Sequence, residues 1–120
     1  MICDLYTKIG GSYEDAKSRL MTDKLIEKFV MKFPADPSFA QLRDAIAAED
    51  IEAAFTAAHT LKGVALNLAF SELGKLGSDL TDTMRENARG KYSWAEYRQM
   101  FMGVEEAYHK VISAIAEYQK

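Results

Sequence analysis

Apolar residues recur along this chain at intervals of three and four positions, the spacing that places them on one side of an α-helix. The segment from about Trp94 to the C-terminus shows the pattern most clearly. Its apolar stripe consists of Phe101, Val104, Tyr108, Val111, Ile112 and Ile115. Alternating β-branched segments, and the Asn-Gly or Asp-Gly turns of hairpins, are missing. We therefore predict an all-α protein.

Helix boundaries are marked by residues that cap or interrupt helices. Gly10-Gly11 ends a short first helix, Pro34 stops a later one, Ser71 marks a break and Gly90 ends the helix after it. The predicted N-caps are Ser12, Thr22, Asp36 (with Pro37 as first helical residue), Asp50 and Ser93 (with Glu96 in a capping box). The later helices are predicted at about residues 13–21, 23–33, 37–48, 51–69, 71–88 and 94–120.

Apolar rows on two of these helices predict which sides face a core. In the helix before Pro34, Leu25, Phe29 and Phe33 recur at four-residue spacing. In the next helix, the residues expected to point inward are Phe39, Leu42 and Ile46. Short turns join the four longer helices, which favours antiparallel neighbours. We expect one domain of residues 1–120, in which an up-down four-helix bundle of residues 36–120 carries the short helices of residues 1–35 at one end.

Composition and charge exclude several classes of function. A chain of 120 residues with 48% hydrophobic and 28% charged residues is typical of a soluble globular domain. Its 15 basic and 18 acidic residues leave no basic surface for a nucleic acid. Cys3 is the single cysteine, so an internal disulfide and a CxxC metal site are excluded. Without a signal-peptide or membrane-length apolar run, we expect a cytoplasmic protein with no membrane association.

The helix at residues 51–69 carries the most informative pattern. On a helical wheel, one stripe within about 80° of arc is apolar. Its members are Ala54, Ala58, Leu61, Ala65 and Leu68. His59 lies about 150° from the centre of this stripe, so its imidazole should reach solvent. A histidine that faces water can offer a nucleophilic nitrogen.

Two neighbours make His59 unusual. Lys62, one turn along, can bring its ammonium toward an anion held on the imidazole. Gly63 stands where a longer side chain would lean over the ring, although glycine inside a helix costs about 1 kcal/mol relative to alanine. Each residue alone has an ordinary interpretation: a surface histidine, a solvated lysine and a glycine for close helix packing. Their combination at this spacing favours a functional site.

The segment AAHTLKGVALNL, residues 57–68, resembles the phosphorylation helix of histidine-containing phosphotransfer (HPt) domains. Their core pattern is His-x-Leu-Lys-Gly, which His59, Leu61, Lys62 and Gly63 match. The predicted helices also resemble that family's four-helix bundle with additional N-terminal helices. One departure is Ala69, at the helix end, where many members carry glycine.

The resemblance implies a phosphocarrier. A ring nitrogen of His59, expected to be Nε2, would accept a phosphoryl group from a receiver-domain aspartate of a hybrid sensor histidine kinase and pass it to a response regulator's receiver. Lys62 would offset phosphate charge and Gly63 would leave room for in-line approach. The partner receiver would supply Mg²⁺. Candidate ring-orienting or docking residues are Phe55, Thr56, Leu66, Ser78, Thr81, Asp82 and Arg85. A monomer is expected.

Three other functions are alternatives to a phosphocarrier. A histidine kinase commonly has an acidic residue after its histidine, whereas Thr60 stands here, and a glycine-rich nucleotide-binding segment is missing. A di-metal bundle is suggested by the Glu-x-x-His pair of Glu106 and His109, but needs a second such pair, and Thr56 occupies the glutamate position before His59. A non-catalytic helical adaptor has the same composition as a phosphocarrier and stays open.

Overall fold

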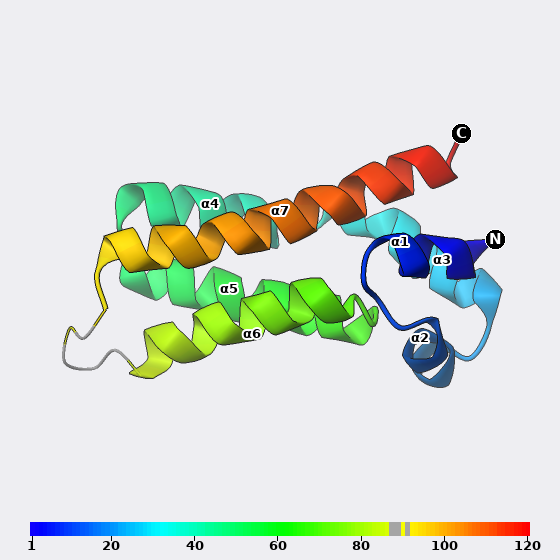
Figure 1. The fold of residues 1–120 in the computed structure, drawn as a ribbon, viewed down its shortest axis with the longest axis horizontal. Helices are drawn as coiled ribbons and strands as arrows, with labels where there is room; N and C mark the ends of the chain where they lie inside the picture. Colours follow the sequence, from blue (N-terminus) through cyan, green and yellow to red (C-terminus); the bar gives the residue numbers. More distant parts are fainter. Residues whose placement is uncertain (87–89, 91) are drawn as a thin grey trace.

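The computed structural model describes residues 1–86, 90 and 92–120, and every regular element among them is helical (Figure 1). The elements are α1 (Ile2–Lys8), α2 (Tyr13–Leu20), α3 (Asp23–Lys32), a 3₁₀ turn η1 (Phe33–Ala35), α4 (Ser38–Ala48), α5 (Ile51–Asn67), α6 (Ser71–Glu86) and α7 (Trp94–Tyr118). The all-α prediction is confirmed. The predicted end of α6 near Ala88 lies outside the described residues.

Side chains cap most helices where the sequence predicts it. Ser12, Thr22, Asp50 and Ser93 each accept a hydrogen bond from the backbone amide three residues on, at 3.1 to 3.3 Å. Asp36 differs, because its carboxylate accepts from the amide and the hydroxyl of Ser38. α4 therefore begins at Ser38, one residue later than predicted.

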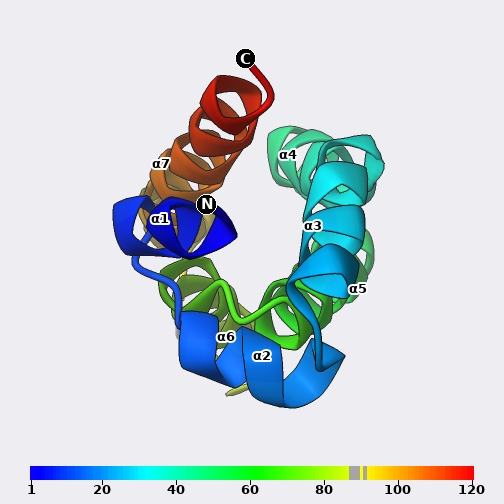
Figure 2. The same cartoon turned by 90° about the vertical axis from the view of Figure 1, so that its right-hand side faces the viewer.

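The helices α4 to α7 form a bundle in which consecutive helices run in opposite directions (Figure 1). Viewed along its length, α5 contacts α4 and α6, and α7 contacts α6 and α4, which closes the ring (Figure 2). The predicted inward residues of α4, Phe39, Leu42 and Ile46, are all buried. Phe39 stacks on the Tyr108 ring of α7 with centroids 3.9 Å apart, and this contact fills the space between α4 and α7.

The three N-terminal helices cover one end of the bundle (Figure 2). The hydroxyl of buried Tyr6 on α1 donates to the Leu68 carbonyl at the end of α5 at 2.7 Å, and burial raises the pKa of Tyr6. The Tyr118 hydroxyl on α7 donates to Glu27 on α3 at 2.9 Å. These long-range hydrogen bonds hold the N-terminal helices against the bundle.

The link between α2 and α3 depends on one carboxylate. Asp23 accepts a hydrogen bond from the Tyr13 hydroxyl and pairs with the Lys17 ammonium at 2.9 Å. The hydrogen bond from Tyr13, followed by that from Lys17, holds the pKa of Asp23 below its usual value. Two helices too short to be stable alone are thereby joined.

The apolar row predicted on α3 faces solvent over part of its length. Leu25 and Phe29 are each 39% exposed, while Ile26 and Val30 are fully buried. Of the predicted row, Phe33 alone is buried, in η1 rather than in α3. The four-residue spacing does not distinguish this row from Ile26 and Val30, which are the residues that the fold buries. Since α3 packs against α1 and α2, the side of α3 that is buried depends on these neighbours.

Ala69, at a position where the resembled family often has glycine, lies in the turn between α5 and α6. α5 ends at Asn67, two residues before the predicted end, and Ala69 adopts a φ of 59°. This left-handed conformation is the one that glycine takes without steric cost. Ala69 is buried, and its carbonyl accepts a hydrogen bond from the Ser12 amide at 3.0 Å. The α5–α6 turn is therefore part of the contact with the N-terminal helices.

Substitution of Gly11 should loosen this contact. A Cβ at Gly11 would lie 2.8 Å from Cδ1 of Tyr6 and 2.9 Å from the carbonyl oxygen of Ala69. We expect Gly11→Ala to lower the free energy of unfolding by about 2 kcal/mol, because a rigid backbone oxygen and a buried ring must move. Urea denaturation followed by circular dichroism measures this. Gly103→Ala is the control, since its Cβ would meet only a Leu76 methyl at 4.0 Å. Equal stability of the two variants would contradict the packing described.

Candidate functional site

His59 stands on the outer face of α5, clear of the core. The five predicted stripe residues of α5 are all buried, and His59 is exposed on the side opposite to them. Across the part of the chain that the structure describes, the imidazole has no hydrogen-bond or ion-pair partner. Its aromatic neighbour among the described residues is Phe55, whose ring centroid lies 6.2 Å away. Both ring nitrogens are therefore free to meet a reactant.

Lys62 lies one turn along α5 and carries an unpaired cation. Its side chain is half-buried, and no carboxylate of the described residues forms an ion pair with it. The nearby acidic residues of α6 are held by cations on their own helix. Asp79 pairs with Lys75 at 3.7 Å, and Asp82 pairs with Arg85 at 3.1 Å. The Lys62 ammonium remains available to an anion on His59.

Gly63 borders open space. A Cβ built there would meet no described atom within 4 Å. Gly74 of α6 is the opposite case, because a Cβ there would lie 2.5 Å from a methyl group of Leu66. Close helix packing therefore explains the glycine at position 74 and does not explain the one at 63. The ordinary interpretation of Gly63 as a packing residue is removed.

The register of α5 against α6 places the other candidates. Gly77 lies against the backbone of Lys62, and a Cβ there would be 3.5 Å from the Lys62 Cα. The Arg85 guanidinium lies over the Phe55 ring, 5.6 Å from its centroid. Because the helices are antiparallel, these contacts put Thr81 at the level of His59 and Ser78 near Lys62.

Thr81 is corrected as a docking candidate. It is fully buried, and its hydroxyl donates to the Gly77 carbonyl of its own helix at 2.7 Å. Because this side chain is buried it cannot contact a partner protein, and it makes no hydrogen bond to the imidazole. Ser78 is half-buried, and Asp82 and Arg85 are each 54% exposed. These three residues therefore stay accessible.

The surface beside His59 joins apolar and charged groups. Half-buried Phe55 and Leu66, 38% exposed, flank the histidine along α5, while Thr56 is exposed one turn before it. The contact between Arg85 and Phe55 is absent from the sequence prediction, which selected these residues separately. If α5 and α6 are aligned antiparallel with Gly77 opposite Lys62, Arg85 falls beside Phe55.

No cluster of three or more metal-ligating side chains is found among the described residues. His109 is exposed on α7, with its ring centroid 5.8 Å from those of Phe39 and Tyr108. The structure therefore adds no ligands to the pair of Glu106 and His109. The described helices also include none with the length and hydropathy of a membrane span.

Comparison with protein-family models matches residues 24–114 to the Hpt domain. The match covers most of the chain, from the start of α3 into the last turns of α7, so this protein belongs to the Hpt domain family. Members of the family are helical bundles that act in histidine phosphotransfer within phosphorelays and interact with receiver domains and kinases. Searches of curated proteins and of solved structures gave no match.

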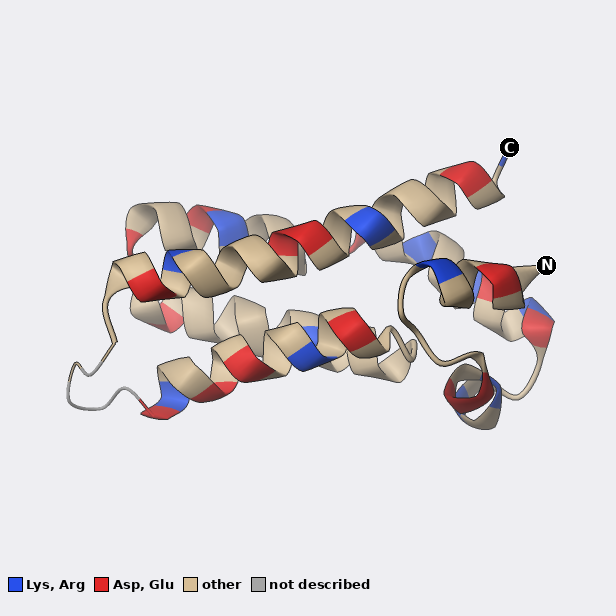
Figure 3. Cartoon of the chain, viewed as in Figure 1, with Lys and Arg blue, Asp and Glu red and all other residues tan. Residues whose placement is uncertain are grey.

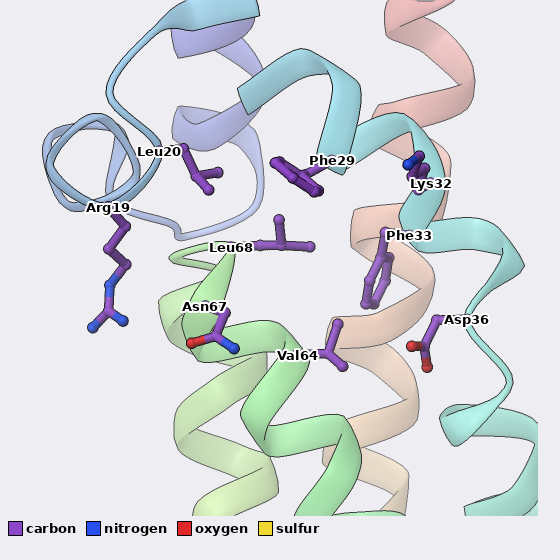
Figure 4. Close-up of a pocket in the computed structure, with 9 residues that line it drawn as sticks. All are labelled: Arg19, Leu20, Phe29, Lys32, Phe33, Asp36, Val64, Asn67 and Leu68. Carbon is purple, nitrogen blue, oxygen red and sulfur yellow. The ribbon is translucent and has the colours of Figure 1, made fainter. Parts of the chain in front are cut away.

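The surface contains a hollow that the sequence does not predict. It has a volume of about 480 Å³ and lies between α2, α3 and the C-terminal end of α5 (Figure 4). None of its lining residues was a predicted site residue. The signal that could have found it is the wheel of α3, on which Leu25 and Phe29 form an apolar face about 100° from that of Ile26 and Val30.

Proposed function

We propose that this protein relays a phosphoryl group between receiver-domain aspartates through a phosphohistidine at His59. The observation that supports this most directly is the arrangement on α5. An exposed imidazole and an ammonium one turn on have no hydrogen-bond or ion-pair partner among the described residues, and the space above Gly63 is open. The adaptor alternative gives no reason for these three features to coincide in an Hpt domain.

The transfer needs one nucleophile from this chain. The lone pair of Nε2 attacks the phosphorus of an aspartyl phosphate, a nitrogen–phosphorus bond forms, and the phosphorus–oxygen bond breaks with its electron pair leaving on the carboxylate. Donation to a second receiver reverses these steps at another aspartate. Mg²⁺ on the partner receiver supplies charge neutralisation during transfer. The chain itself contributes position and local charge.

Lys62 and Gly63 have separate roles in the transfer, one electrostatic and one steric. Phosphohistidine carries a phosphate charge of roughly −2 at neutral pH, which the Lys62 ammonium partly offsets. Gly63 keeps the space beside the ring clear, so that attacking and leaving atoms can lie in line. Phe55, Leu66, Thr56, Ser78, Asp82 and Arg85 form the surrounding contact surface.

The partners that follow from this proposal are a hybrid sensor histidine kinase and a response-regulator receiver domain. A monomer in the cytoplasm suits such a carrier, because the phosphohistidine must diffuse between two proteins. Nothing in this scheme requires a nucleotide site or a resident metal in the chain.

Labelling at His59 tests the proposal. A receiver domain phosphorylated with ³²P should transfer label to the protein in an acid-labile, alkali-stable form. His59→Gln should abolish labelling while helicity stays unchanged, because the position is exposed. His109→Gln, which alters the other histidine, is the control and should label fully. Persistent label in His59→Gln would refute the assignment, and absence of label in the wild-type protein would favour the adaptor.

The charge role of Lys62 is separable from stability. We expect Lys62→Ala to shorten the phosphohistidine lifetime or to slow transfer about two- to fivefold, since a partly solvated charge pair contributes roughly 0.5 to 1 kcal/mol. Decay of the isolated phosphoprotein measures the phosphohistidine lifetime, and a quenched time course with the receiver measures the transfer rate. Lys8→Ala, which removes an exposed lysine of α1, is the control. Equal values for the two variants would reduce Lys62 to a solvated charge.

The steric role of Gly63 predicts a loss of rate without a loss of fold. Gly63→Gln should slow transfer about tenfold to a hundredfold, because displacement of the reacting groups by about 1 Å has effects of this size. Its melting temperature should not fall, since no described atom lies within 4 Å of the new Cβ. Gly63→Ala, with a side chain too short to cover the ring, is the matched control. A wild-type transfer rate in Gly63→Gln would count against the steric argument.

A further inference from the structure

The charged side chains of α5 are Glu52 and Lys62, and both lie on the side of the helix that carries His59. At roughly 100° per residue, Glu52 is about 20° from the direction of His59, and Lys62 is about 60° from it on the other side. Glu52 is exposed and lies two turns before the histidine. The charge of this helix is therefore confined to the surface around the nucleophile.

The carboxylate of Glu52 has no cation beside it. Within the part of the chain that the structure describes, it forms no hydrogen bond and no ion pair. The arginines of α4 and of the start of α7 already have partners. Arg43 pairs with Asp44 at 3.2 Å, and Arg98 pairs with Glu49. The negative charge of Glu52 is therefore uncompensated at the surface.

The flank formed by α6 differs, because its charges beside His59 are paired. Acidic and basic residues are interspersed along this helix (Figure 3). Asp79 pairs with Lys75 at 3.7 Å, and Asp82 pairs with Arg85 at 3.1 Å. A partner that approaches the histidine thus meets a nearly neutral flank on α6 and two unpaired charges on α5.

A hollow of about 470 Å³ lies beside Glu52, between α4 and α5. Its lining consists of Gln41, Asp50, Glu52, Ala53, Thr56 and Ala57. The Asp50 carboxylate is engaged as the N-cap of α5, since it accepts a hydrogen bond from the Ala53 amide at 3.1 Å. The small side chains of Ala53 and Ala57 leave space for the aliphatic stem of a lysine or arginine, whose charged end would meet Glu52.

A receiver domain that reaches His59 also covers Glu52. The two residues lie on one face of α5, and at the rise of an α-helix they are about 10 Å apart. A standard interface covers about 800 Å² on each partner, equivalent to a disc of roughly 16 Å radius. A carboxylate that is covered without a cation loses its hydration and weakens the complex. The receiver must therefore bring positive charge to this position.

We propose that Glu52 is a specificity-determining residue, which selects a receiver domain that carries a basic side chain where it meets the start of α5. This inference rests on the proposed function. The basic side chain enters the hollow between α4 and α5 and pairs with the Glu52 carboxylate, while the acceptor aspartate faces His59. Because Lys62 lies beyond His59 along the helix, charges of opposite sign flank the nucleophile and fix one orientation of the receiver.

Glu52 also has a local role, because an acidic side chain in the first turn of a helix interacts favourably with the helix dipole. This local role predicts an effect on stability and none on transfer. Glu14 is the matched control, since it is an exposed glutamate that likewise lies two residues after an N-cap, in α2. α2 lies beyond the turn that joins α5 to α6 (Figure 1).

The test measures transfer to the full chain from a ³²P-labelled receiver domain, selected from a panel for labelling the wild-type protein. Glu52→Lys should lower kcat/KM at least tenfold at low salt, with a smaller difference at high salt, because like charges then meet. Glu52→Gln should lower it about threefold. Glu14→Lys should transfer at the wild-type rate. Labelling of His59 by phosphoramidate, a small donor that forms no protein interface, should match wild type in all three variants.

Charge reversal on the receiver identifies the group that meets Glu52. Each exposed lysine and arginine of the receiver is changed in turn to glutamate. One of these receiver variants should be slow with the wild-type protein and should transfer to Glu52→Lys faster than the unchanged receiver does. A purely structural role of Glu52 would not produce such a rescue.

The outcomes separate the two proposals. If neither the receivers nor phosphoramidate label His59, the phosphocarrier function fails, and the role of Glu52 with it. If labelling proceeds and Glu52→Lys keeps the wild-type kcat/KM, or if no receiver variant restores its transfer, the specificity role alone is overturned. Slower labelling of Glu52→Lys by phosphoramidate would overturn it as well, because the charge would then act on His59 rather than on the partner.

Discussion

The burial of a narrow alanine-rich face of α5 is the constraint on which the rest of this structure depends. Ala54, Ala58 and Ala65 are fully buried, and their small side chains let neighbouring helices approach closely. Gly77 extends this on α6 by lying directly against the backbone of Lys62. Once this face is committed to the core, the opposite face must meet solvent, and His59 is on it. The position of the nucleophile thus follows from packing on the far side of its helix.

The proposed transfer requires only one nucleophile and local charge from this chain, and the structure provides both. Phosphoryl transfer depends chiefly on placement and charge, so a rigid helix with an accessible imidazole is sufficient when a partner brings Mg²⁺. Asp79 and Asp82 of α6 pair with cations of their own helix, and no carboxylate of the described residues forms an ion pair with Lys62.

The N-terminal helices show how a local irregularity joins two parts of the fold. Ala69 holds a left-handed conformation in the tight turn after α5, and its carbonyl receives the amide of Ser12. Tyr6 donates to the neighbouring Leu68 carbonyl. Backbone groups exposed by the end of α5 are satisfied by the segment between α1 and α2, so the turn and the N-terminal helices stabilise each other.

The sequence by itself determined the helices, most of their caps, the buried face of α5 and the exposure of His59, because helical periodicity and capping are local properties of the chain. It failed where two faces of comparable apolarity competed: Leu25 and Phe29 were predicted to form the apolar row of α3, and the tertiary structure buried Ile26 and Val30 instead. Which side of a short helix is covered depends on neighbours distant in sequence. The same reason explains buried Thr81, the contact of Arg85 with Phe55, and the hollow beside α3, all of which require two or three helices to be brought together.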